Sequence, residues 1–209
     1  MKHFKNLLLL VVTLFFAISL ISCGKTEDPV ESGSENNNSN GSNEKPNETN
    51  EHRILVAYFS ATNTTKHIAE LINEEVDGVL FEIIPAVSYT SADLNYNNSN
   101  SRTSLENKDD SIRPEIKGTV ENMEQYDVVY IGYPIWFGKA PKPVYTFFEA
   151  YDFSGKTIIP FCTSGSSSIG SSATYLEKLT KSATWLNGTR FSSTANQSTV
   201  ASWIEGLKY

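Results

Sequence analysis

The chain has 209 residues, of which 17 are Lys or Arg and 24 are Asp or Glu, so its formal net charge at pH 7 is −7. No segment gathers the basic side chains that bind a phosphate backbone, which argues against a nucleic-acid partner. The 3 histidines and 2 cysteines lie far apart in the sequence, so their spacing does not predict a metal site.

The first 22 residues have the pattern of a bacterial lipoprotein signal peptide. Lys2 and Lys5 precede a mainly apolar run that is short for a membrane span and ends in "LISC" at 20–23. This ending resembles the lipobox, in which the cysteine becomes the lipid-modified first residue. We therefore expect lipid on Cys23 and a protein that is exported and lipid-anchored to the bacterial cell envelope, with the membrane as a partner. An ordinary signal peptide and an uncleaved anchor helix are the alternatives.

Residues 23–52 are predicted to form a disordered tether. After Cys23 their only large apolar side chain is Val30, and Asn, Ser, Glu and Gly dominate the rest. Such a segment cannot bury enough apolar surface to offset the entropy that ordering would cost. As a flexible coil it would span about 30 Å. The folded domain is then expected at 53–209.

Apolar runs of strand length alternate with amphipathic segments across this domain. The first run, "RILVAYF" at 53–59, is almost entirely apolar, which is typical of a strand covered on both faces. Apolar side chains at helical spacing follow it and end before Gly78. We predict strands at 53–59, 79–84, within 126–136, at 156–165 and within 183–191, with helices after the first strand and at 140–151, 172–181 and 196–207.

This alternation predicts an α/β fold with right-handed crossovers. Five strands suit a doubly wound five-stranded parallel sheet with helices on both faces, and hence three layers. Residues 85–113 do not fit a minimal layout, because they form a long polar stretch rich in Asn and Ser. A loop of this length is usually functional or disordered. We expect residues 114–125 to form the next crossover helix.

In a sheet of this kind, ligands bind outside the carboxyl ends of the strands. The first strand is followed by "SATNTT" at 60–65, where five polar side chains stand at a helix start. Unpaired N–H groups and the helix dipole attract a phosphate there, and hydroxyl groups can donate further hydrogen bonds. The segment matches neither a Walker loop nor a dinucleotide fingerprint. The alternative is a helix cap with extra hydroxyl groups.

The segments that follow the predicted third and fourth strands also have the composition of ligand-binding loops. "GYPIWFGKAP" at 132–141 places aromatic residues between Gly and Pro, which suggests a stacking wall for a flat ring. Some of these aromatics are expected in the core instead, with Tyr133 and Phe137 as the first candidates. "TSGSSSIG" at 163–170 has small residues that let the backbone approach a ligand edge, although a merely flexible loop would look similar.

Taken together, these segments resemble the flavodoxin family of FMN-binding proteins, in the subgroup whose second loop reads Y-P-I-W-x-G. The resemblance is carried by "AYFSATNTT", "IGYPIWFGKAPKPV" and "PFCTSGSSSIG", and it extends to the polar stretch "SADLNYNNSNSRTS" and to "RPEI". It covers essentially all of 53–209. The family usually has glycine where this chain has Asn63, and Asn tolerates a positive φ better than most other residues.

The resemblance implies that FMN is the cofactor and that it supplies the redox chemistry, so no catalytic side chain is expected. Trp136 would be the stacking partner of the flavin ring. The implied contacts are Ser60, Thr62, Asn63, Thr64 and Thr65 for the phosphate; Pro134, Ile135, Trp136, Phe137 and Gly138 beside the ring; and Thr163, Ser164, Gly165 and Gly170 along its other edge.

Three functions remain open at this point. The first is electron transfer at the cell envelope, with a redox partner protein, a quinone or another small-molecule acceptor as partner. The second is an NAD(P)H- or quinol-dependent flavin or quinone reductase, in which residues 85–113 help to form the substrate pocket. The third is a non-enzymatic surface domain that has lost the flavin, which the intact aromatic loop argues against.

Overall fold

The computed structural model describes residues 53–209. The predicted signal peptide, the lipidation site Cys23 and the tether lie outside these described residues. Within the described range, none of the helices has the length and apolar character that crossing a membrane requires.

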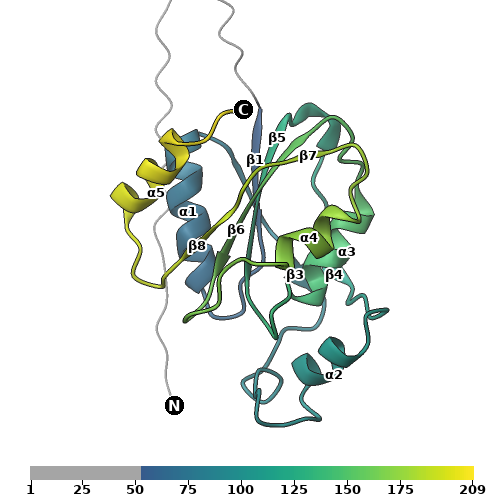
Figure 1. Cartoon of the computed structure of the whole chain (residues 1–209). Coiled ribbons are helices and arrows are strands. Elements are labelled where there is room, and N and C mark those ends of the chain that lie inside the picture. Colours follow the sequence, from purple (N-terminus) through teal and green to yellow (C-terminus); the bar gives the residue numbers. More distant parts are fainter. Residues whose placement is uncertain (1–52) are drawn as a thin grey trace, which may run out of the picture. The chain divides into compact units, whose positions relative to one another are not determined.

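A parallel sheet forms the centre of the domain (Figure 1). Its strands run in the order β2-β1-β5-β6, and two short strands, β7 and β8, pair with the outer side of β6. This order is that of the predicted doubly wound α/β sheet, which is thereby confirmed. The strands are β1 (Ile54–Tyr58), β2 (Val79–Glu82), β5 (Val128–Pro134), β6 (Thr157–Thr163), β7 (Thr184–Trp185) and β8 (Thr189–Phe191).

The segment 183–191 forms two strands rather than one. β7 pairs with Thr157 and Ile158, and β8 pairs with residues 161–163, so the ladder is interrupted opposite Ile159 and Pro160. Proline has no N–H group to donate to a neighbouring strand. The interruption therefore follows from the position of Pro160 within β6.

Helices cover both faces of the sheet and give the three predicted layers (Figure 1). α1 (Thr64–Val76) and α5 (Gln197–Glu205) lie on one face, and α3 (Lys142–Ala150) and α4 (Ser172–Glu177) lie on the other. Alternate residues of β1 enter the two cores: Val56 packs with the α1 side, and Leu55 packs with the α3 side. Burial on both faces explains why the sequence of β1 is apolar without alternation.

The connection between β2 and β5 differs from the prediction. The polar stretch at 85–113 contains the helix α2 (Arg102–Lys108), and β3 (Ile84–Pro85) pairs antiparallel with β4 (Ile116–Lys117). The predicted crossover helix at 114–125 is wrong, since only a 3-10 turn at Met123–Gln125 is helical there. Gly118 and Asn122 have φ angles of 74° and 52°, and a residue with positive φ does not continue a right-handed helix.

One close approach in the sheet gives a test of the fold. Gly132 of β5 lies opposite Phe161 of β6, and a Cβ added at Gly132 would stand 2.2 Å from the Phe161 ring. We expect Gly132→Ala to lower the free energy of unfolding by about 1–3 kcal/mol, because the ring must move within a packed core. Urea unfolding measures this. The control is Gly165→Ala, where the added Cβ meets nothing within 4 Å; an equal loss in both variants would contradict the packing argument.

Candidate functional site

Three loops meet at the carboxyl edge of the sheet and are tied together by Thr163. The hydroxyl group of Thr163 is 2.8 Å from that of Thr65, so the start of α1 is joined to the end of β6. The N–H of Ile135 donates to the carbonyl oxygen of Thr163 at 3.0 Å, which joins the loop after β5 to the same residue. Both hydroxyl groups lie in buried residues. The three predicted loops therefore form one fixed edge.

The loop between β1 and α1 presents hydrogen-bond donors that lack partners. Asn63 has a φ of 62°, so the positive φ expected at this position is present, and its side chain does not cap α1. The first amide groups of the helix are thus left without a side-chain partner. The Ser60 hydroxyl group is buried and has no hydrogen-bond partner within the described residues. A buried polar group without a partner costs about 1–3 kcal/mol, which an acceptor-rich ligand can recover.

Trp136 is held edge-on by two other aromatic rings. Its ring centroid lies 5.4 Å from that of Phe59 and 5.1 Å from that of Tyr89, both in T-shaped arrangements. Its own turn is closed by reciprocal backbone hydrogen bonds of 3.0 and 2.9 Å with Lys139. Aromatic pairs of this geometry stabilise by about 0.5–1.5 kcal/mol beyond their burial. The Trp136 ring therefore has a defined position at the sheet edge.

Tyr133 and Phe137, the other two aromatic residues near Trp136 in the sequence, differ in burial. Tyr133 is fully buried, as predicted, and its hydroxyl group lies 3.1 Å from that of Ser172. The expectation that Phe137 packs in the core is wrong, because Phe137 is 40% exposed. Phe137 and Gly138 have φ angles of 51° and 76° at the tip of the turn. This tip carries the Phe137 ring away from the sheet and against Tyr96, at 4.9 Å between centroids.

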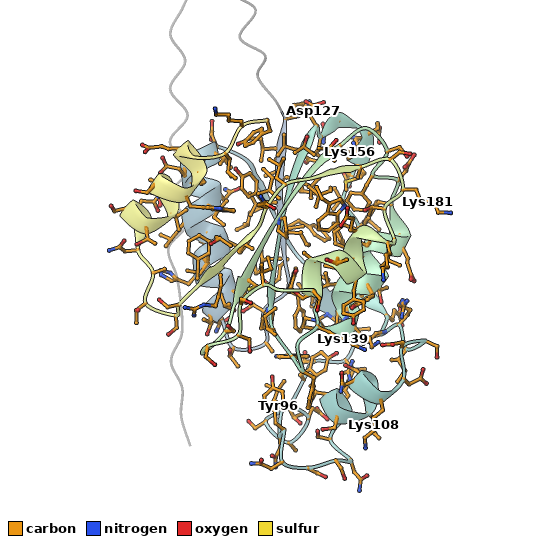
Figure 2. All side chains as sticks on the ribbon, viewed as in Figure 1. Tyr96, Lys108, Asp127, Lys139, Lys156 and Lys181 are labelled. Atoms are coloured by element: carbon orange, nitrogen blue, oxygen red, sulfur yellow. The ribbon has the colours of Figure 1, made fainter. Side chains whose placement is uncertain are left out.

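Two adjoining cavities lie among these loops. Their volumes are about 240 and 310 Å³, and Thr62, Tyr96, Pro134 and Trp136 line both of them. Tyr96 comes from the segment between β2 and β5 (Figure 2). None of the residues that line either cavity is charged: the first is completed by Ser60, Ala61, Thr65 and Leu94, and the second by Thr64, Ile135, Thr163, Ser164, Gly165 and Ser193.

Most of the predicted contact residues line these cavities, and four do not. Asn63 shapes the turn before α1, Phe137 and Gly138 form the tip of the next turn, and Gly170, with a φ of 46°, lies in the turn before α4. The residues in the lining are Ser60, Thr62, Thr64, Thr65, Pro134, Ile135, Trp136, Thr163, Ser164 and Gly165.

Sequence reasoning missed Leu94, Tyr96 and Ser193, which also line the cavities. Leu94 and Tyr96 are isolated apolar and aromatic residues within a segment of Asn and Ser. That contrast in composition was the only local signal for them. Ser193 follows β8, whose place in the sheet could not be assigned in detail from the sequence.

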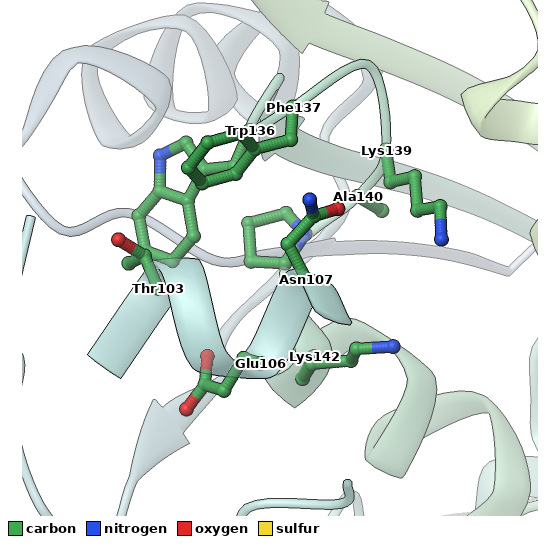
Figure 3. A pocket seen from close by; sticks show the side chains of 9 residues that line it. Thr103, Glu106, Asn107, Trp136, Phe137, Lys139, Ala140 and Lys142 are labelled. Atoms are coloured by element: carbon green, nitrogen blue, oxygen red, sulfur yellow. The ribbon is translucent and has the colours of Figure 1, made fainter. Parts of the chain in front are cut away.

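A buried polar network fixes the segment around α2 behind Trp136. The Tyr89 hydroxyl group donates to Glu106 Oε2 at 2.8 Å, and Arg102 Nε donates to Glu106 Oε1 at 2.7 Å. The Arg102 guanidinium also lies 3.9 Å from the centre of the Tyr89 ring. Burial, followed by the Glu106 charge, raises the pKa of Tyr89, so its phenol stays protonated and donates. Figure 3 shows Glu106 on α2, on the other side of a small hollow from Trp136.

A second, more exposed contact lies beyond α2. Asp110 Oδ1 accepts hydrogen bonds of 2.9 Å from both Lys139 and Lys142. These two hydrogen bonds, together with the positive charge of the lysines, lower the pKa of Asp110 to about 2. The loop that carries Trp136 is thus attached to the preceding segment by ion pairs as well as by aromatic packing.

Comparison with known proteins gives a consistent result. A family model described as flavodoxin matches residues 53–207. The structure of a candidate flavoprotein from Bacteroides eggerthii is 47% identical, with a TM-score of 0.70, and covers 74% of this chain and 96% of that chain. One from Bacteroides uniformis is 44% identical, with a TM-score of 0.71, and covers 74% and 98%.

A more distant structure shares the fold. It is a flavoprotein from Lactobacillus acidophilus in complex with FMN, 20% identical, with a TM-score of 0.56, covering 73% of this chain and 99% of that chain. No match was found among curated proteins.

The buried network can be tested by changing its carboxylate. We expect Glu106→Gln to lower the free energy of unfolding by about 1–3 kcal/mol, because the side chain is only 7% exposed and two donors lose a charged acceptor. Urea unfolding measures the change. The control is Glu149→Gln: Glu149 pairs with Arg113 at 2.8 Å and its side chain is 41% exposed, so its loss should stay below about 1 kcal/mol. Similar losses in both variants would count against a special role for the network.

The Asp110 ion pairs predict a dependence of stability on pH. The pKa of Asp110 in the folded protein, about 2, lies below its ordinary value of 3.8. The stabilisation is therefore fully present above pH 4 and is lost as the pH falls toward 2. Because the Asp110 side chain is 77% exposed, we expect Asp110→Asn to cost less than about 1 kcal/mol at pH 7. Thermal unfolding should show this difference at pH 7 and a much smaller one below about pH 2; a difference of unchanged size at low pH would contradict the assignment.

Proposed function

The chain belongs to the flavodoxin family, and from this premise we propose that it binds FMN at the carboxyl edge of the sheet and acts in electron transfer. The observation that carries the proposal is one uncharged cavity region whose lining combines two kinds of groups. It includes the unpartnered Ser60 hydroxyl group beside the uncapped start of α1, and it includes the Trp136 ring.

The residues around the start of α1 suit a phosphate. The hydroxyl groups of Ser60, Thr62 and Thr64 and the first amide groups of α1 would donate to its oxygens, and the helix dipole favours its negative charge. The buried Ser60 hydroxyl group would then gain the partner that it lacks within the described residues. No Lys or Arg lines either cavity, so binding would rest on neutral donors.

The residues that follow β5 and β6 suit a flat ring. Pro134, Ile135 and Trp136 would flank it, and the small residues from Thr163 to Gly165 would border its edge. The volumes of the two cavities together fall within the range of about 300–1,000 Å³ that is usual for ligand sites. The FMN complex of the Lactobacillus acidophilus flavoprotein, which has the same fold, supports this choice of ligand.

FMN, when bound, would supply the redox chemistry by taking up and releasing electrons. The protein's own contribution would be orientation and exclusion of water. The hydrogen bonds at Thr163 hold the three loops at fixed distances, and Phe59 and Tyr89 keep the Trp136 ring in place. No side chain in the cavity lining is needed as a general acid or base.

The proposed place of action is the cell envelope. The proposal includes export, lipid on Cys23, and a tether of residues 24–52 that lets the domain reach a redox partner protein or a small-molecule acceptor at the cell envelope. The signal-like sequence ending in "LISC" supports it. Metabolic labelling with a fatty acid, compared with the Cys23→Ala variant, would test it; label that persists in the variant would contradict it.

A second candidate is a reductase that oxidises NAD(P)H or a quinol. The observation in its favour is that Leu94 and Tyr96, from the segment between β2 and β5, line the cavity as a substrate pocket would require. Saturable turnover with NADPH and a quinone would support this function, and its absence would favour the electron carrier.

The first experiment is a titration of the purified full-length protein with FMN, followed by quenching of flavin fluorescence. We expect stoichiometric binding, and weaker binding of riboflavin, which lacks the phosphate that Ser60 and α1 would hold. Absence of binding would contradict the proposal. It would favour the third function, a surface domain that keeps the fold but has lost the flavin.

Two variants test the assignment of the ring site. Trp136→Ala should weaken FMN binding about tenfold or more, since stacking of an aromatic ring on a base contributes about 1–3 kcal/mol. His67→Ala is the control, because His67 is exposed on α1 and outside the cavity lining, and it should change the dissociation constant less than twofold. Equal effects of the two substitutions on the dissociation constant would contradict the assignment of Trp136 to the ring site.

A further inference from the structure

One edge of the parallel sheet is open. β2 is the outermost strand at the end of the sheet opposite β6, and within residues 53–209 no strand pairs with its outer side. Its sequence, "VLFE", includes neither Lys nor Pro, the residue types with which proteins usually protect such an edge. An open edge offers free N–H and C=O groups to a further strand. β2 is therefore the place where the sheet can be extended.

The side chains of β2 are mostly apolar and partly exposed. Val79 is 48% exposed and Leu80 is 37% exposed. Val79 is the neighbour of Leu55 in β1 and so lies on the α3 face of the sheet. Leu80 is the neighbour of Val56 and lies on the α1 face. Apolar surface is thus exposed on both faces of the same edge, and a contiguous apolar patch is typical of an interaction site.

A cavity lies beside β2 on the α3 face. It has a volume of about 310 Å³, and Val79, Phe81, Val120 and Tyr126 are among the residues that line it. In a doubly wound sheet a crossover helix usually covers such a position. Here residues 114–125 form only β4 and a 3-10 turn. The absence of a helix from this segment leaves the cavity uncovered beside the edge strand.

The sequence of β2 is self-complementary when two copies pair antiparallel about Leu80. Opposite residues in such a pair point to the same face, so Leu80 would meet Leu80 of the second copy, and Val79 would meet Phe81. Glu82 would lie opposite Gly78, which has no side chain. Pairing centred on Phe81 would instead place Leu80 against the carboxylate of Glu82. The apolar pattern therefore selects one register.

The charges at the two ends of β2 also favour antiparallel pairing of two copies. At one end, Lys66 of α1 lies 4.0 Å from Glu82. At the other end, Asp77 closes α1 and precedes Gly78. Antiparallel pairing brings the end with Lys66 toward Asp77 of the other copy, so this cation gains a second carboxylate. Parallel pairing would place the Asp77 end of one copy beside the Asp77 end of the other.

We propose that β2 is a homodimer interface, in which residues 78–82 of two copies pair antiparallel about a two-fold axis at Leu80 and form one continuous sheet. The other side of the sheet offers no equivalent edge, because its outer ladder is interrupted opposite Pro160. An interface that uses the same edge in both copies closes as a dimer and does not grow into a filament. The inference is independent of the proposed FMN binding, since residues 78–82 lie outside the lining of the cavity region.

The first test traps the pairing with a disulfide bond. It uses the purified full-length protein with the change Cys23→Ala, in which the buried Cys162 is the only native thiol. In Leu80→Cys the two new thiols would face each other across the axis, so mild oxidation should yield at least fivefold more covalent dimer than in the control. The control is Val79→Cys, at a more exposed position. Its two thiols would lie two positions apart along the strands, beyond the Cα separation of about 7 Å that a disulfide can span.

The second test places a charge at the axis. Sedimentation equilibrium of the same Cys23→Ala protein should show a dimer whose population rises with concentration. Leu80→Lys and Leu80→Glu should each raise the dissociation constant more than about tenfold, because like charges would meet. An equimolar mixture of the two variants should recover dimers, because opposite charges would then meet. The control is Leu105→Lys, at an exposed leucine of α2, which should leave the association unchanged.

Three outcomes would overturn the inference. The first is a protein without the Leu80 substitutions that stays monomeric up to about 1 mM, a concentration at which even weak specific association is detected. The second is equal cross-linking of Leu80→Cys and Val79→Cys, since the pairing would then not follow the proposed register. The third is a mixture of Leu80→Lys and Leu80→Glu that stays monomeric although circular dichroism shows both to be folded. Failure of the protein to bind FMN would contradict the proposed function and leave the dimer standing.

Discussion

The hydrogen bond between the hydroxyl groups of Thr65 and Thr163 joins residues that are 98 positions apart. It fixes the start of α1 against the end of β6, and the Ile135 amide binds the carbonyl oxygen of the same threonine. A buried hydroxyl group without a partner would cost about 1–3 kcal/mol, so the two side chains support each other and hold the loops together. These hydrogen bonds therefore join the three strand ends that line the cavity region.

The segment between β2 and β5 packs against the loop that carries Trp136 at the carboxyl edge of the sheet. Its buried contact, from Tyr89 through Glu106 to Arg102, lies directly behind Trp136, whereas Asp110, which accepts from Lys139 and the buried Lys142, is itself exposed to water. Water screens the exposed ion pairs, so the buried network should hold the segment more firmly. This segment thus supplies part of the site wall although its regular structure is limited to α2, the short β3–β4 pair and one 3-10 turn.

The sequence was informative where burial on both faces or a helix start determined the structure. The apolar runs of β1, β5 and β6 predicted the central sheet, and the hydroxyl-rich segment at 60–65 and Trp136 were placed at the correct edge. The defined conformation of the 85–113 segment was not predictable in the same way. It depends on contacts between residues that are not neighbours in the sequence, such as the hydrogen bond from Tyr89 to Glu106. The exposure of Phe137 depends on a positive φ at a residue type that rarely adopts it.

The proline within β6 has a consequence for how copies of the domain meet. An uninterrupted strand beyond β6 would present a row of free backbone groups onto which another molecule could add a strand, which is a usual route to aggregation. Here that outer position holds only the two residues of β7 and the three residues of β8, separated opposite Ile159 and Pro160. Neither piece is long enough to hold a foreign strand in register. Pro160 therefore lets the apolar parallel sheet end at this side without offering an edge to which another molecule can add a strand. This protection against aggregation would matter most where many copies are crowded together.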